Sequence, residues 1–99
     1  MSHKPTTVAE LGEFTVLIDA RSPAEYALDH IPGAINMPLS SFQASRLPAA
    51  NGRRLVLNCL GGKRSAMALD KCSVAQEVVD THLAGGFGAW QAARLPVEN

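Results

Sequence analysis

The chain has 99 residues, which is enough for one domain with a single hydrophobic core that needs neither disulfides nor a structural metal. Nine lysines and arginines balance nine aspartates and glutamates, so the zero net charge argues against nucleic acid or an anionic membrane as the main partner. The N-terminus lacks the apolar segment of a signal peptide, and no apolar run approaches the roughly 20 residues that cross a bilayer. We therefore expect a soluble, cytoplasmic protein.

Expected helices and strands alternate along the chain. They are, in chain order, a helix over 8–11 capped by Thr6 or Thr7, a strand over 14–18, a helix from Pro23 to about His30, a strand over 34–37, a helix over 42–47, a strand over 54–58, a helix over 65–75, a strand over 78–83 and a helix over 87–93. The helix at Pro23 has the sharpest start, because Ser22 is a good N-cap and Glu25 completes a capping box. This alternation predicts an α/β fold in which a parallel sheet carries helices on both faces.

Polar and reactive side chains follow two of these strands. Asp19 and Arg21 come directly after the strand over 14–18, and Cys59 comes directly after the strand over 54–58. Because sites in parallel sheets form beyond the carboxyl ends of the strands, we expect these side chains at one edge of the sheet. We interpret Asp19 and Arg21 as a structural pair that fixes the loops there.

A loop that joins a strand to a helix follows, with the sequence Cys59-Leu60-Gly61-Gly62-Lys63-Arg64-Ser65. A free thiol has a pKa near ~8.5, and only the thiolate is a good nucleophile. Three features should lower the pKa of Cys59: inward-facing amides of residues 60–65, which Gly61 and Gly62 permit; the dipole of the helix beginning near Ser65; and the charges of Lys63 and Arg64. We therefore predict a nucleophilic Cys59 in a cradle that binds anions.

The substrate of such a loop should be a small anion with an atom that a thiolate can attack. Arg64 can hold an oxyanion through two parallel N–H bonds, and Lys63 supplies a looser charge. Sulfur transfer and phosphoryl or arsenate chemistry both fit this description. Cysteine phosphatases use a Cys-x5-Arg loop that wraps a tetrahedral phosphate, whereas the form here is Cys-x4-Arg. The smaller ring suits a single sulfur atom on Cys59, which favours sulfur transfer.

Four stretches occur in a fixed order: Leu17–Tyr26, His30–Pro38, Cys59–Ser65 and Leu83–Trp90. Together they resemble the single-domain rhodaneses, which are thiosulfate sulfurtransferases. The resemblance implies one rhodanese-like domain over residues 1–99, with a three-layer fold around a five-stranded parallel sheet. It also implies that Cys59 takes sulfane sulfur from a small anionic donor, forms a persulfide, and yields the sulfur to cyanide, a thiol or a protein acceptor. No metal or cofactor is expected.

Other interpretations stay open. One is a carrier module that accepts sulfur from a partner protein and shows little activity on free thiosulfate. A phosphatase or arsenate reductase is disfavoured by the loop length. For Cys72, on a helix, we favour a buried core position over a redox partnership with Cys59. We expect His30 to hydrogen-bond the backbone, and Phe87 and Trp90 to belong to the core.

Overall fold

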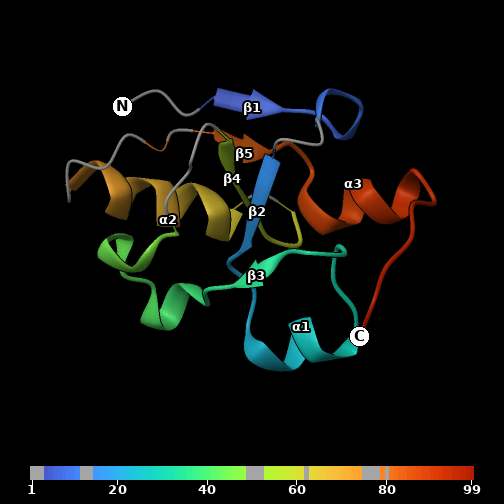
Figure 1. Cartoon of the computed structure of the whole chain (residues 1–99), viewed down its shortest axis with the longest axis horizontal. Helices are drawn as coiled ribbons and strands as arrows, with labels where there is room; N and C mark the ends of the chain where they lie inside the picture. The colour runs from blue at the N-terminus through green and yellow to red at the C-terminus, as the bar shows by residue number, and fades with distance from the viewer. Residues whose placement is uncertain (1–3, 12–14, 49–52, 62, 75–78, 80) are drawn as a thin grey trace.

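The computed structural model describes residues 4–11, 15–48, 53–61, 63–74, 79 and 81–99. Among these residues, parallel strands form one sheet in the order β1-β5-β4-β2-β3 (Figure 1). The strands are β1 (Lys4–Thr6), β2 (Thr15–Asp19), β3 (Ile35–Asn36), β4 (Arg54–Asn58) and β5 (Thr81–Leu83). The helices are the 3-10 segments η1 (Val8–Glu10), η2 (Leu39–Ser41) and η3 (Ala44–Arg46), and the α-helices α1 (Pro23–Leu28), α2 (Lys63–Val74) and α3 (Gly86–Ala92). The predicted fold class, an α/β fold with a five-stranded parallel sheet, is confirmed.

Alternate residues of the central strands pack against different layers. Ile18 and Leu57 belong to a cluster that includes Leu69 of α2. Val56, between Leu55 and Leu57 in the same strand, belongs to a second cluster that includes Phe87 of α3. Figure 1 shows α2 and α3 on opposite sides of β2. The central strands are thus covered on both faces, which explains why their sequences are continuously apolar.

The first α-helix begins where the capping box predicts. The hydroxyl oxygen of Ser22 accepts a hydrogen bond from the Glu25 N–H at 3.2 Å, and the Glu25 carboxylate accepts one from the Ser22 N–H at 3.0 Å. The helix ends at Leu28, two residues before the predicted end near His30. Glu25 is therefore held against the backbone at the helix start, which matters for the site described below.

The strand β1 was not predicted. It lies at the edge of the sheet beside β5, a position that tolerates Pro5 because edge strands can lack an N–H donor. Directly after it, the Glu10 carboxylate accepts a hydrogen bond from the Thr7 N–H at 3.1 Å in a second capping box. The helix predicted over 8–11 is a single 3-10 turn, η1.

The prediction of a helix over 42–47 is wrong. Within this segment only the 3-10 turn η3 is helical, and the 3-10 turn η2 ends just before it, at Ser41. Phe42 lies between them with extended backbone (φ −64°, ψ 128°), and its side chain is buried in the cluster that includes Leu69. Burial of this one large ring requires a backbone conformation that an unbroken helix does not provide, and tertiary packing therefore overrides the local preference.

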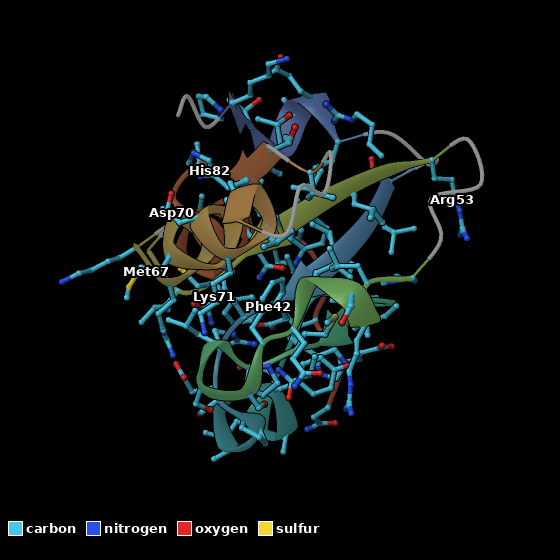
Figure 2. The ribbon with its side chains drawn as sticks, turned by 90° about the vertical axis from the view of Figure 1, so that its left-hand side faces the viewer. Phe42, Arg53, Met67, Asp70, Lys71 and His82 are labelled. Carbon is cyan, nitrogen blue, oxygen red and sulfur yellow. The ribbon has the colours of Figure 1, made fainter. Side chains whose placement is uncertain are left out.

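Helix α2 begins at Lys63, two residues before the predicted start. Over positions 63–72, where burial is described, its buried residues are Ser65, Ala68, Leu69 and Cys72, which recur at the spacing of one helical face. Cys72 is fully buried, as expected for a core position. Met67, between buried Ser65 and Ala68, faces away from the sheet: it is 49% exposed and projects outward in Figure 2.

The last strand and the last helix differ slightly from their predicted bounds. The strand predicted over 78–83 is confirmed for Thr81–Leu83 and is wrong at Val79, which is not in a strand; positions 78 and 80 lie outside the described residues. Helix α3 begins at Gly86, one residue earlier than predicted. In the part of the chain that the structure describes, no helix has the length and apolar character that a membrane span requires.

The C-terminal segment is tied to His30. The His30 ring Nδ1 lies 2.8 Å from the carbonyl oxygen of Tyr26, which agrees with the predicted backbone contact. Glu98 adds two backbone hydrogen bonds to His30, and its carboxylate accepts the Gly33 N–H at 3.1 Å. The chain end thus closes over the turn that leads into β3.

An ion pair in which both side chains are buried, Asp19 with Arg21, joins the ends of β2 and α1. Both the backbone N–H and the guanidinium of Arg21 donate to the Asp19 carboxylate, with guanidinium contacts of 2.9–3.1 Å. A further N–H of Arg21 donates to the carbonyl oxygen of Asp29 at 2.7 Å. The exposed side-chain fractions are 0% for Asp19 and 4% for Arg21. The pair predicted from the sequence therefore fastens the end of α1 to the edge of the sheet.

Replacing Asp19 with asparagine should lower the free energy of unfolding by about 3–5 kcal/mol, because the Arg21 charge would stay buried without its partner. Urea denaturation followed by circular dichroism measures this difference. Asp70→Asn on the exposed side of α2 is the matched control, and it should lower stability by less than about 1 kcal/mol. Equal losses in the two variants would contradict a structural role for the buried pair.

Candidate active site

Cys59 lies directly beyond the carboxyl end of β4. The strand register pairs Asp19 with Asn58, and the Ala20 N–H donates to the carbonyl oxygen of Asn58 at 2.8 Å. This register places Ala20 beside Cys59, so the ends of β2 and β4 form one edge, as predicted. Cys59 is 1% exposed, so its sulfur lies at the base of the loop rather than at its rim.

Ser65, in the first turn of α2, lies against the sulfur. Its hydroxyl oxygen accepts a hydrogen bond from the Cys59 thiol at 3.7 Å, and the residue is fully buried. A serine hydroxyl can donate a hydrogen bond to a thiolate, and such bonds to charged acceptors are stronger than those between neutral groups. The structure therefore brings together two of the residues that the loop sequence singled out.

Helix α3 holds the loop from the other side. The Phe87 N–H donates to the Cys59 carbonyl oxygen at 2.6 Å, and the Gly88 N–H donates to the Leu60 carbonyl oxygen at 3.0 Å. The approach is possible because Gly86 has no side chain: a Cβ there would lie 2.8 Å from the Leu60 carbonyl oxygen and closer still to that of Cys59. Gly86 also has φ +56°, which favours glycine.

The buried Asp19–Arg21 pair reaches the same loop through Phe87. The Arg21 guanidinium carbon lies 4.2 Å from the centre of the Phe87 ring, a cation–π contact. Phe87 is itself 1% exposed. Phe87, whose N–H binds the Cys59 carbonyl, is thus packed against the buried ion pair at the sheet edge. This contact supports the interpretation of Asp19 and Arg21 as a structural pair.

Arg64 makes an ion pair that the sequence did not indicate. Its two terminal nitrogens lie 2.5 Å and 3.0 Å from the two carboxylate oxygens of Glu25, and both side chains are about one-third exposed. The hydrogen bond from Arg64 lowers the pKa of Glu25 from 4.5 to about 2. The same bond raises the pKa of Arg64, and the charges of Glu25, Cys59 and Asp19 add to this shift. The predicted contact between Arg64 and substrate stays a prediction.

The other loop residues are placed as follows. Leu60 and Gly61 are exposed, and Lys63 is the exposed first residue of α2. Gly62 lies outside the described residues. A pocket of about 280 Å³ opens beside the loop, lined by Ala20, Ser22, Pro38, Leu39, Ser40 and Arg64.

Sequence reasoning missed three residues of this region. Glu25 was identified only as part of a capping box, and Gly86 only as part of a motif. Asn58 is fully buried, and among the described residues its amide atoms have no hydrogen-bond partner. A polar residue at the end of an otherwise apolar strand was the available signal for Asn58. No group of three metal-ligating side chains occurs in the described parts of the chain.

Comparisons with known proteins place these features in context. The family model for the rhodanese-like domain matches residues 5–93. The chain is 38% identical over 94 residues to the uncharacterised protein slr1261 of Synechocystis, covering 93% of this chain and 52% of that protein. It is 31% identical over 85 residues to a sulfurtransferase of Allochromatium vinosum, covering 86% of this chain and 79% of that protein. It spans about half the length, or less, of several other curated relatives.

A solved structure of a thiosulfate sulfurtransferase from Pseudomonas aeruginosa is also similar. The TM-score is 0.80 at 31% sequence identity, and the match covers 98% of this chain and 19% of that chain. This similarity extends over almost all of the present chain, including the sheet and the loop.

Replacing Gly86 with alanine should push α3 away from the loop, because the new Cβ would collide with two backbone carbonyl groups. We expect a loss of about 3 kcal/mol in the free energy of unfolding, from strain at positive φ and two weakened hydrogen bonds. Urea denaturation measures this loss. Alkylation of Cys59 by iodoacetamide, followed by mass spectrometry, should show a changed rate.

Gly61→Ala is the matched control for the stability measurement, because a Cβ at this position would meet no atom of the described residues within 4 Å beyond its chain neighbours. It should change the free energy of unfolding by less than about 1 kcal/mol. A Gly86→Ala protein as stable as Gly61→Ala would show that the close approach of α3 is unimportant.

The ion pair of Glu25 predicts a specific pH dependence of stability. Because the folded protein lowers the pKa of Glu25 from 4.5 to about 2, the pair stabilises the fold fully above about pH 4.5, and this contribution is lost as the pH falls toward 2. At pH 7 the wild type should exceed Glu25→Gln by up to about 1 kcal/mol, since solvent screens a partly exposed pair. Urea denaturation of both proteins at pH 7, 4 and 2.5 should show this difference shrinking. A difference independent of pH would contradict the assignment.

Proposed function

The chain belongs to the rhodanese-like family, and on that premise we propose that it is a sulfurtransferase that works through a persulfide on Cys59. The match to the family covers most of the chain, and the family includes sulfurtransferases. The observation that carries the proposal is the position of Cys59 at the sheet edge, with its carbonyl held by α3 and its sulfur beside Ser65. This arrangement fixes the backbone of one cysteine just before a helix that begins with Lys63 and Arg64.

In the first step, the Cys59 thiolate attacks the outer sulfur of the donor. A sulfur–sulfur bond forms on Cys59 as the sulfur–sulfur bond of the donor breaks, and sulfite leaves with the electron pair when the donor is thiosulfate. In this proposal Ser65, whose hydroxyl oxygen lies 3.7 Å from Cys59 Sγ, donates its O–H to the thiolate and stabilises the charge before attack. In the same proposal the partly exposed Arg64 contacts the leaving oxyanion with N–H groups that Glu25 does not use.

In the second step, a thiophilic acceptor attacks the terminal sulfur of the persulfide. With cyanide, the products are thiocyanate and the Cys59 thiolate, so the enzyme returns to its starting state. The scheme is a double displacement and needs no separate general base, because the attacking thiolate is already deprotonated. This scheme requires the loop to keep the same position whether Cys59 is a thiolate or a persulfide. The hydrogen bonds from α3 to the Cys59 and Leu60 carbonyls serve that purpose.

Replacing Cys59 with serine should lower thiocyanate formation from thiosulfate and cyanide by roughly a thousandfold or more, because the nucleophile is lost. After treatment with thiosulfate, the wild-type mass should increase by one sulfur atom, and this increase should disappear with excess thiol and be absent in the variant. Colorimetric detection of thiocyanate and intact-protein mass spectrometry make these measurements.

Cys72→Ala is the matched control, since Cys72 is buried in the core on the opposite part of α2 from the loop. It should keep both the activity and the added sulfur. Sulfur on Cys72 instead of Cys59 would contradict the proposal. Hydrolysis of an aryl phosphate that Cys59→Ser abolishes would support the phosphatase alternative. A persulfide that forms only from a protein donor would support the carrier alternative.

A further inference from the structure

The ion pair between Glu25 and Arg64 is built into the start of α1. One oxygen of the Glu25 carboxylate accepts both the Ser22 N–H, at 3.0 Å, and an N–H of Arg64, at 2.5 Å. The other oxygen accepts a second N–H of Arg64 at 3.0 Å. The carboxylate cannot turn away from Arg64 without weakening the capping box, so the pairing is a fixed feature of the site.

This pairing changes the charge that the loop offers to a substrate. Arg21 is buried against Asp19, and Arg64 is matched by Glu25, so Lys63 is the loop cation for which the described structure shows no carboxylate partner. A dianion that used both terminal nitrogens of Arg64 would have to displace the Glu25 carboxylate, and it would be repelled by that carboxylate on approach. A donor with a single negative charge faces half of this repulsion.

The pocket beside Arg64 suits an organic group. Three of its six lining residues, Ala20, Pro38 and Leu39, present apolar side chains, and two others present hydroxyl groups. The strand register places the backbone of Ala20 beside that of Cys59, so this pocket lies at the same edge of the sheet as the cysteine. Inorganic thiosulfate has no part that would gain from apolar contact, whereas an alkyl or aryl donor buries its carbon atoms there.

We propose that Glu25 sets the donor specificity of the site. Because its carboxylate binds both terminal nitrogens of Arg64, singly charged organic sulfane donors are preferred over dianionic thiosulfate. The inference rests on the proposed sulfurtransferase function. For a thiosulfonate donor, R–SO₂–S⁻, the Cys59 thiolate attacks the outer sulfur, the donor sulfur–sulfur bond breaks, and the sulfinate R–SO₂⁻ leaves with the electron pair. Charge balances, because a thiolate and a thiosulfonate give a persulfide anion and a sulfinate.

The test compares two donors that differ in charge and in apolar surface: thiosulfate and benzenethiosulfonate, each with cyanide as acceptor. The wild type should show the higher kcat/KM with benzenethiosulfonate. Glu25→Gln keeps a hydrogen-bond acceptor for the Ser22 N–H and removes the competing charge. It should raise kcat/KM for thiosulfate about tenfold, mainly through a lower KM, and change that for benzenethiosulfonate by less than about threefold.

The second capping box provides a matched control. Glu10→Gln makes the same chemical change at the same helix position, in a box where the carboxylate binds Thr7 rather than an arginine. It should leave the ratio of the two kcat/KM values unchanged. A lower kcat/KM for thiosulfate in Glu25→Gln would overturn the inference, because it would show that Glu25 only positions Arg64 for the substrate. An unchanged ratio would overturn it as well.

A second variant tests the pocket without touching the ion pair. Leu39→Ala should lower kcat/KM for benzenethiosulfonate about threefold to tenfold and leave that for thiosulfate within about twofold, because only the organic donor loses apolar contact. Equal effects on both donors would contradict the pocket assignment. If neither donor places sulfur on Cys59, the proposed function fails and this inference fails with it; if both do and the ratio does not respond to Glu25→Gln, only this inference fails.

Discussion

The position of the Cys59 loop depends on how closely α3 approaches it. Two N–H groups of the first turn of α3 bind the carbonyl oxygens of Cys59 and Leu60, and the absence of a side chain at Gly86 allows this distance. Phe87, which supplies one of these N–H groups, is packed beneath the buried Arg21. The stretch Leu83–Trp90, which contains Phe87, and the stretch Leu17–Tyr26, which contains Arg21, thus meet behind the loop. A reactive cysteine needs such support, because small displacements of a nucleophile have large effects on rate.

Charge at this edge is decided by pairing rather than by the number of basic residues. Arg21, Lys63 and Arg64 would together suggest a strongly cationic cradle. Asp19 neutralises Arg21 in the interior, and Glu25 neutralises Arg64 at the rim. Glu25 serves two purposes, since the same carboxylate that caps α1 also binds Arg64. A helix cap is therefore linked directly to the electrostatics of the candidate site.

The elements with strong local signals were predicted well. The strand β4 has its predicted bounds, and the capping box of α1 starts the helix at the predicted residue. Errors occurred where packing opposes local preference. The segment over 42–47 would favour a helix by itself, but Phe42 is extended with its ring buried, and only Ala44–Arg46 form a 3-10 turn. β1 was missed because its pairing with β5 joins segments nearly 80 positions apart, which a short sequence window does not reveal.

The sequence by itself determined the central strands, the start of α1 and the Cys59 loop with its spacing to Arg64, because each depends on residues a few positions apart. The order of four such local motifs along the chain was enough for the family resemblance. Only the tertiary structure decided that Arg64 faces Glu25, 39 positions away, and that Gly86 lies against the Cys59 carbonyl. The physical reason is that both contacts arise between different layers of the fold. Which side chains meet there depends on how α1, α2 and α3 pack around the sheet, and local propensity carries no information about that packing.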